Sequence, residues 1–377
     1  MVDRIIKDNP LRKLSALGQS IWLDYIERDL IASGELRRLI EEDGLRGMTS
    51  NPSIFEKAIA GCHEYDEDIR IMALEGKDVK TIYEVLIQRD VQSAADEFWP
   101  LYDKTNGLDG YVSLEVNPHL AHDTMGTLKE ARRLWALLNR PNVFIKVPAT
   151  VEGMPVIQQL INEGINVNVT LLFGIPRYRQ AAEAYLTGVK ARTTQRKPIK
   201  IVASVASFFV SRIDSLVDPQ LEKIIMQEGE KAEIAKKLHG QIAIASAKEA
   251  YQTYKEIFGG EQFRKLADKG FRPQRLLWAS TSTKNPEYND VKYIEALIGR
   301  DTVNTIPIET LDLYRDHGKP EVRIEQEVMN AHWMLDRLPE LGINIDNVTQ
   351  QLEDEGIEKF NKSFDTLMQT LEKATGK

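Results

Sequence analysis

Cysteine is almost absent from this sequence, with Cys62 the single one among 377 residues. A lone thiol excludes an intramolecular disulfide and any metal site that needs several cysteines. Cys62 lies in the polar connecting segment "GCHEY", so we interpret it as incidental. The fold must therefore depend on an ordinary hydrophobic core, for which a hydrophobic content of 42% is sufficient.

Long apolar runs and runs of basic residues are also missing. No stretch approaches the ~18 apolar residues of a membrane-spanning helix, and the N-terminal stretch "MVDRIIKDNPLRKLSALG" lacks the apolar segment of a secretory signal. The net charge is -8, and no cluster of Lys and Arg would attract phosphate backbones. We therefore expect a cytoplasmic protein with neither nucleic-acid nor membrane partners.

Short apolar runs, each followed by a segment of helical pattern, recur along the whole chain. They predict eight strands, at residues 20–26, 44–50, 110–116, 142–148, 166–173, 200–208, 275–281 and 301–307. Eight strands alternating with helices are typical of the α/β class and of a (β/α)8 TIM barrel in particular. An open doubly wound sheet is the second choice, because no G-x-G-x-x-G turn follows the first strand.

The connecting segments predict helices of two kinds. Residues 123–140 and 151–164 have the spacing of amphipathic crossover helices. Two longer connections predict helical insertions, with several polar helices near 51–109 and one or two long helices near 213–272. Residues 322–375 predict C-terminal helices. Because no repeat and no linker rich in Pro, Gly or Ser interrupts the chain, we expect all 377 residues to form a single domain.

Side chains of a strand alternate between two faces, and in these predicted strands one face is apolar while the other carries polar groups. In "NVFIKV", Val143, Ile145 and Val147 share one face, and Phe144 and Lys146 share the other. The same alternation predicts the polar residues that enter the barrel, namely Asp24, Glu115, Lys146, Asn168 and Thr170.

A buried lysine is costly unless it is paired or has lost its proton. Barrel enzymes keep their chemistry at the carboxyl-terminal ends of the strands, so Lys146 beside Glu115 and Asp24 is a candidate Schiff-base nucleophile. The alternative is a structural network of ion pairs that fills the barrel. The residue pattern alone leaves both interpretations open.

Five motifs link the sequence to a known family. They are "TSNPSIF" (49–55), "VSLEV" (112–116), "FIKVPAT" (144–150), "NVNVTLLF" (166–173) and "SFFVSRID" (207–214). In this order they resemble transaldolase, a class I aldolase-type enzyme of the pentose phosphate pathway with a (β/α)8 barrel. The chain length and the segment "STSTKNP" (280–286) resemble the longer transaldolase subgroup, some of whose members are fused to a glucose-6-phosphate isomerase domain.

The resemblance implies transfer of a dihydroxyacetone unit from a ketose phosphate (sedoheptulose 7-phosphate or fructose 6-phosphate) to an aldose phosphate (glyceraldehyde 3-phosphate or erythrose 4-phosphate). Lys146 would form the Schiff base, and Asp24 would be the general acid/base for the C3–C4 bond. Glu115 and Thr170 would position a water for proton transfer. Because the protonated imine is the electron sink, the resemblance implies no metal and no cofactor.

Asn51, Asn168 and Ser207 match residues that hold the dihydroxyacetone hydroxyls in the family.

The resemblance also separates the candidate from two alternatives. Fructose-6-phosphate aldolases are related lysine-imine barrels. Their chains are much shorter and have a tyrosine at the position of Phe209, so the length of this chain and its phenylalanine favour resemblance to transaldolase. The other alternative is a catalytically silent phosphosugar-binding protein, but none of the expected catalytic side chains is missing.

Sugar phosphates as substrates require a phosphate site. Arg212 matches the phosphate-binding arginine of the family, and a guanidinium suits a phosphate because its donors bind two oxygens at once. Ser280 would add a hydroxyl to the same phosphate. Shorter transaldolases have a second arginine where this chain has Ser282, and Lys284 is the candidate replacement.

Each of these residues also has a simpler structural explanation. Asn51 can cap a turn, Thr170 can be a β-branched filler, and Arg212 can pair with Asp214 or Asp218 on a helix surface. The sequence leaves the oligomeric state, monomer or homodimer, open.

Overall fold

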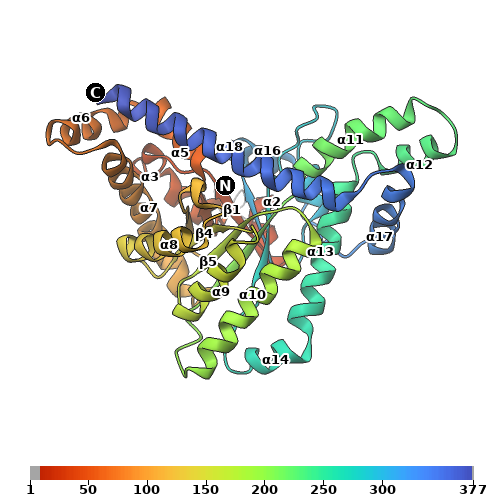
Figure 1. Cartoon of the computed structure of the whole chain (residues 1–377), viewed down its shortest axis with the longest axis horizontal. Coiled ribbons are helices and arrows are strands. Elements are labelled where there is room, and N and C mark those ends of the chain that lie inside the picture. Colours follow the sequence, from red (N-terminus) through yellow and green to blue (C-terminus); the bar gives the residue numbers. More distant parts are fainter. Residues whose placement is uncertain (1–8, 376–377) are drawn as a thin grey trace.

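A closed barrel of parallel strands forms the centre of the protein (Figure 1). The computed structural model describes residues 9–375. Each strand pairs with the next in chain order, and β8 pairs with β1. The strands are β1 (Gln19–Asp24), β2 (Gly47–Thr49), β3 (Tyr111–Glu115), β4 (Val143–Pro148), β5 (Val167–Leu172), β6 (Ser204–Phe209), β7 (Arg275–Ala279) and β8 (Thr302–Ile306). The predicted (β/α)8 TIM barrel is confirmed.

The predicted alternation of side chains is confirmed as well. An inner apolar cluster fills the barrel and consists of Trp22, Tyr111, Phe144, Val205, Leu277, Ala279 and Val303. The opposite parity, with Val143, Ile145 and Val147 as examples, belongs to the larger core between strands and helices. Both faces of every strand are thus buried, which is typical of parallel sheets.

Helices surround the barrel. The α-helices are α2 (Pro10–Ala16), α3 (Arg28–Ala32), α4 (Glu35–Arg38), α5 (Pro52–Gly61), α6 (Asp66–Leu74), α7 (Val79–Lys104), α8 (Thr124–Leu138), α9 (Gly153–Glu163), α10 (Ile175–Thr194), α11 (Ser211–Ile225), α12 (Glu230–Leu238), α13 (Ile242–Gly259), α14 (Glu261–Ala267), α15 (Lys292–Ala296), α16 (Ile308–His317), α17 (Val328–Arg337) and α18 (Ile345–Ala374). Shorter turns are η1 (Leu39–Asp43), η2 (His63–Tyr65), η3 (Pro118–Leu120) and η4 (Leu338–Leu341). Within residues 9–375, no helix has the length and apolar character needed to cross a bilayer.

The two predicted crossover helices are present as α8 and α9, and α9 ends at Gly164, whose φ is 91°. The connection near 51–109 holds α5, α6 and α7, as expected. The prediction of one or two long helices near 213–272 is wrong, because this part of the chain holds the four helices α11 to α14. Gly229 and Gly240 have positive φ, which a continuous right-handed helix does not allow.

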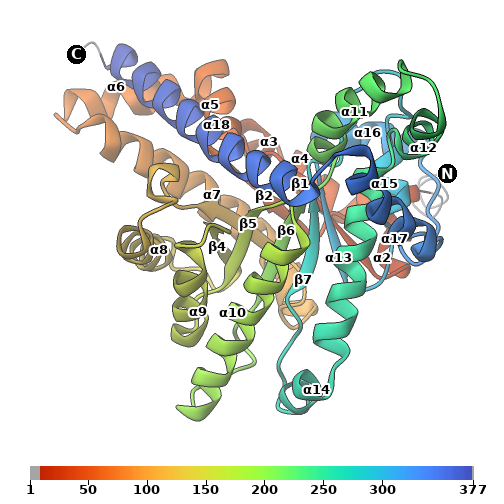
Figure 2. The same cartoon turned by 45° about the vertical axis from the view of Figure 1, so that its right-hand side comes forward.

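Helix α18 lies across the carboxyl-terminal face of the barrel (Figures 1 and 2). Gly356 lets it approach β5 closely, since a Cβ at this position would lie 3.0 Å from the Leu171 side chain. The hydroxyls of Ser363 and Ser53 are 2.8 Å apart and join α18 to α5. The sequence predicted helices within 322–375, but not that one of them covers the mouth of the barrel.

A buried ionic network closes the opposite, amino-terminal end of the barrel. Asp109 lies 3.0 Å from Arg275 and 2.6 Å from Arg46, and it accepts a hydrogen bond of 2.8 Å from Ser20. Burial opposes ionisation of Asp109, but the two guanidinium groups hold its pKa below the usual value. A buried structural ion-pair network therefore exists at the end of the barrel opposite to Lys146.

Two carboxylates of α11 fasten the loop that follows β7. The Tyr293 hydroxyl donates to Asp214 at 2.8 Å, and the Tyr288 hydroxyl donates to Asp218 at 2.6 Å. The backbone N–H of Ala243 also donates to Asp214, at 2.7 Å, and so ties α11 to α13. Burial, followed by the nearby charge of Asp218, raises the pKa of Asp214 to about 6.

The raised pKa of Asp214 predicts a loss of stability as the pH rises. Its ordinary value is 3.8, so the folded state binds a proton that the unfolded chain has released between about pH 4 and 6. Stabilisation on the order of 3 kcal/mol is therefore present below this window and lost across it. We expect Asp214→Asn to flatten this part of the pH dependence of Tm in calorimetry. The exposed Asp268→Asn is the control, and identical pH profiles for both variants would contradict the prediction.

The backbone of Gly47 in β2 lies close against a buried aromatic ring of the barrel interior. A Cβ there would lie 2.6 Å from the ring of Trp22, which is fully buried. We expect Gly47→Ala to destabilise the protein by about 1–3 kcal/mol, because overpacked side chains must shift. Urea unfolding followed by tryptophan fluorescence measures the effect. The control is Gly61→Ala, where a Cβ meets nothing within 4 Å, and equal unfolding midpoints for the two variants would refute the expected strain.

Candidate active site

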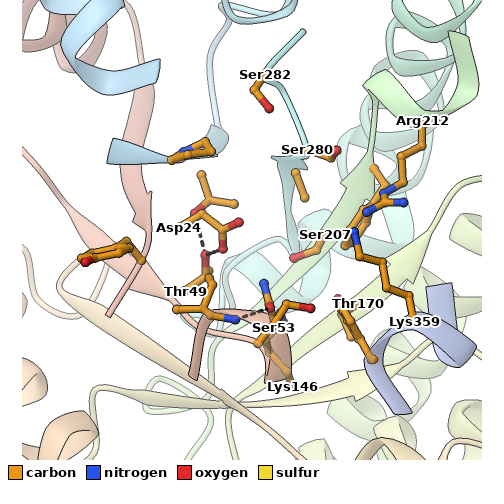
Figure 3. Close-up of a pocket in the computed structure, with 18 of the residues that line it drawn as sticks. Asp24, Thr49, Ser53, Lys146, Thr170, Ser207, Arg212, Ser280, Ser282 and Lys359 are labelled. Carbon is orange, nitrogen blue, oxygen red and sulfur yellow. Dashed lines mark hydrogen bonds between the residues drawn. The ribbon is translucent and has the colours of Figure 1, made fainter. Parts of the chain in front are cut away.

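The predicted site residues converge on a cavity of about 290 Å³ at the carboxyl-terminal ends of the strands, below α18 (Figure 3). Its lining includes the predicted residues Asp24, Asn51, Lys146, Thr170, Ser207, Phe209, Arg212, Ser280 and Lys284. Glu115 and Asn168 do not line the cavity but contact residues that do. Closure of the barrel thus brings together side chains from seven of its strands or the loops after them.

Lys146 lies on β4 and is 4% exposed. Its Nζ donates to the backbone oxygen of Ser50 at 3.0 Å and lies 3.2 Å from Oε2 of Glu115. The parallel register places Glu115 of β3 directly beside Lys146. The amine is therefore fixed by one charged and one neutral partner, and it remains at the cavity surface.

Asp24 ends β1 and points into the same cavity (Figure 3). Its Oδ1 accepts a hydrogen bond of 2.6 Å from Oγ1 of Thr49, which lies 2.6 Å from the hydroxyl of Thr305. Burial raises the pKa of Asp24, while the nearby Lys146 and the Thr49 bond oppose the shift. A carboxyl with a raised pKa exchanges protons closer to neutral pH, as a general acid/base requires.

Glu115 and Thr170 lie on the strands to either side of Lys146. Burial raises the pKa of Glu115, and Lys146 partly offsets this shift. Within the described part of the chain, Glu115 Oε1 and Thr170 Oγ1 are buried without a hydrogen-bond partner.

A hydrogen-bonded chain of polar side chains supports the floor of the cavity. Ser207 Oγ donates to Oδ1 of Asn168 at 2.6 Å, and Nδ2 of Asn168 donates to Ser113 Oγ at 3.1 Å. Asn51 has two roles, because its Oδ1 caps α5 by accepting from Ile54 N–H at 3.1 Å and the residue also lines the cavity. The simple explanation of Asn51 as a cap is therefore correct but incomplete.

Two residues with strained backbone lie at or next to the cavity, since Ser280 lines it and Leu171 follows the lining residue Thr170. Leu171 and Ser280 have φ values of 58° and 55°, in a region that non-glycine residues rarely occupy. Leu171 accompanies a shift in the register between β5 and β6, directly after Thr170. On the neighbouring wall, Phe209 packs against Phe173 with ring centroids 5.1 Å apart. The strain thus occurs where β5 and β7 deliver side chains to the cavity.

One wall of the cavity is cationic. The predicted Arg212 and Lys284 line it together with Lys57 and Lys359, which the sequence analysis did not identify. Arg212 forms no ion pair with Asp214 within residues 9–375, since that carboxylate is held by the groups described above. Burial lowers the pKa of Arg212, and burial followed by the charge of Arg212 lowers the pKa of Lys284 and Lys359.

Two groups stand out among the lining residues that the sequence analysis missed. Thr49 and Thr305 have the inward parity of their strands, so the alternation used for the other strands would have identified them. Lys57 comes from α5, which directly follows β2. Lys359 and Phe360 come from α18, whose position over the barrel no strand pattern reveals.

Known proteins similar to this chain agree with the predicted resemblance. A sequence profile of the family described as Transaldolase/Fructose-6-phosphate aldolase matches residues 21–371. A protein named Transaldolase from Trichodesmium erythraeum is 48% identical over 375 residues, which cover 98% of both chains. Another Transaldolase, from Thiobacillus denitrificans, is 46% identical over 360 residues, or 96% of this chain and 99% of that protein. The chain therefore belongs to the transaldolase/fructose-6-phosphate aldolase family.

Proposed function

We propose that this protein is a transaldolase that transfers a dihydroxyacetone unit from a ketose phosphate to an aldose phosphate. The observation that carries the proposal is the buried amine of Lys146, held between Glu115 and the backbone of Ser50 at the surface of a cavity that also receives Asp24. The names of the similar proteins point to the same activity.

Imine formation is the first step. The neutral amine of Lys146 attacks the ketose carbonyl to give a carbinolamine. The carbinolamine hydroxyl takes up a proton, which the Glu115 carboxyl would supply, and leaves as water to give the iminium. Glu115 and Thr170 would hold a water that carries protons to and from the departing hydroxyl. Their unpartnered buried oxygens support this role.

Carbon–carbon bond cleavage is the second step. The carboxylate of Asp24 accepts the proton of the C4 hydroxyl, the C3–C4 bond breaks, and its electron pair moves into the iminium to form an enamine on Lys146. The aldose phosphate leaves, a second aldose phosphate enters, and the same steps run in reverse with Asp24 as the acid. Asn51 and Ser207 would hold the hydroxyls of the three-carbon unit, with Asn168 orienting Ser207.

The substrate phosphate would lie against Arg212, with Ser280 and Lys284 beside it. Small sugar phosphates are thus the proposed partners, and the cytoplasm is the proposed compartment. We also propose that the whole chain is one domain.

A fructose-6-phosphate aldolase would use the same imine but release free dihydroxyacetone. The family description covers both activities, so the acceptor distinguishes them. A transaldolase turns over fructose 6-phosphate only when an acceptor aldose phosphate is present, whereas steady release of dihydroxyacetone without an acceptor would indicate the aldolase. A silent binding protein would do neither.

Borohydride trapping tests the imine. We expect incubation with fructose 6-phosphate and borohydride to add a reduced three-carbon unit to Lys146, detected by intact-protein mass spectrometry and peptide mapping. Lys146→Ala should lose both the adduct and turnover. An unmodified Lys146, under conditions that label a control aldolase, would reject the proposed mechanism.

The same experiment on Asp24→Asn separates imine formation from bond cleavage. The amide can still accept from Thr49 but cannot take the C4 hydroxyl proton, so we expect cleavage to slow by about 10²–10⁴-fold. The trapped adduct should then retain the intact six-carbon phosphate rather than the three-carbon unit. Wild-type turnover by this variant would exclude Asp24 as the base.

The pH dependence follows from the raised pKa of Asp24. Because Asp24 must be ionised to start cleavage, single-turnover cleavage should fall as the pH falls through a value above that of an ordinary aspartate. Asp24→Asn should lack this acid limb. An acid limb preserved in the variant would assign it to a different group, and rapid-quench measurements across the pH range distinguish the two results.

A further inference from the structure

Four cationic side chains from four separate parts of the chain line one cavity. Lys57 comes from α5, Arg212 from α11, Lys284 from the loop after β7 and Lys359 from α18. In Figure 3, Arg212 and Lys359 approach the cavity from the same side. Three of the four lie on a helix or loop that directly follows a barrel strand, since α5 follows β2 and α11 follows β6. Lys359 comes from α18, far from any strand in sequence, and only tertiary packing brings it here.

None of these four cations forms an ion pair with a carboxylate inside the described range 9–375. A carboxylate of α18 does pair elsewhere, since Glu353 lies 3.1 Å from Arg177 of α10. The chain has 57 acidic against 49 basic residues, so acidic partners are abundant. The one polar contact within the group is a hydrogen bond of 2.8 Å from Lys284 to Ser282.

Grouping unpaired cations raises the free energy of the empty site. Burial and the charge of Arg212 lower the pKa of both Lys284 and Lys359, while Asp24 and Glu355 act as weak opposing charges without pairing. A bound anion would remove this repulsion. A phosphate monoester carries about -1.5 to -2 charges and three acceptor oxygens, which suits one guanidinium, several ammonium groups and adjacent hydroxyls.

We propose that Lys57 and Lys359 bind the substrate phosphate together with Arg212 and Lys284, so that α5 and α18 are part of the substrate site. This assignment rests on the proposed function, because that reaction supplies the phosphorylated substrate. Four cations exceed the charge of one carboxylate, so the site selects a phosphate dianion over a carboxylate.

The packing of α18 fixes the position of Lys359. Phe360, the next residue, is buried at the cavity, and the contact of Gly356 with Leu171 seats the helix on the end of β5 one turn earlier. The hydroxyl pair of Ser53 and Ser363 holds α5, and hence Lys57, against the same helix. Both lysines are therefore carried by a helix pair that is seated independently of the substrate.

Isothermal titration of the full-length protein with inorganic phosphate tests the assignment without turnover. We expect Lys57→Gln and Lys359→Gln each to weaken phosphate binding by about tenfold, because each removes a charge-assisted hydrogen bond. Lys359→Arg should restore binding. The control is Lys362→Gln, an exposed lysine on the same helix that does not line the cavity. Unchanged phosphate binding in both Lys57→Gln and Lys359→Gln would overturn the proposal.

A second measurement separates this proposal from the proposed function. Loss of phosphate binding in the two variants, combined with no borohydride adduct on wild-type Lys146, would support the anion site and reject the transaldolase. A trapped adduct on the wild type, combined with wild-type phosphate affinity in both variants, would support the transaldolase and reject the role of Lys57 and Lys359. If wild-type Lys146 forms the adduct and the two variants lose phosphate binding, both proposals are supported. KM for fructose 6-phosphate should then rise about tenfold in Lys359→Gln and stay unchanged in Lys362→Gln.

Discussion

The contact of Lys146 with Glu115 across two neighbouring strands is the constraint on which the site depends. An ammonium at 4% exposure is tolerated only because a carboxylate lies 3.2 Å away and a backbone oxygen lies 3.0 Å away. The parallel register of β3 and β4 fixes this pairing. Closure of the barrel determines which other groups share the cavity with that amine.

The two ends of the barrel hold charge for different reasons. At the amino-terminal end, Asp109 is saturated by Arg275, Arg46 and Ser20, and its pKa is lowered. At the carboxyl-terminal end, Asp24 has a raised pKa and one hydroxyl partner. A saturated network stabilises the fold, whereas an incompletely satisfied one retains the capacity to exchange protons with a substrate.

The cavity is assembled from strands and from helices that pack over them. The strands supply Lys146, Asp24 and the hydroxyl groups, whereas α5 and α18 supply cations and part of the apolar wall. The backbone strain at Leu171 and Ser280 falls where these two contributions meet. In the proposed mechanism, the strands carry the chemistry at the carbon skeleton, while helices and the loop after β7 recognise the anion.

The sequence by itself determined the eight strands and their inward and outward faces, because a period of two is a local property. Its ordered motifs also pointed to nine of the residues that line the cavity. The same alternation along the strands would also have identified Thr49 and Thr305 as inward-facing residues. The sequence did not determine the four separate helices of the 213–272 connection or the place of Lys57 and Lys359. The position of α18 depends on the contact of Gly356 with Leu171, which joins residues far apart in the chain, and only tertiary packing decides such contacts.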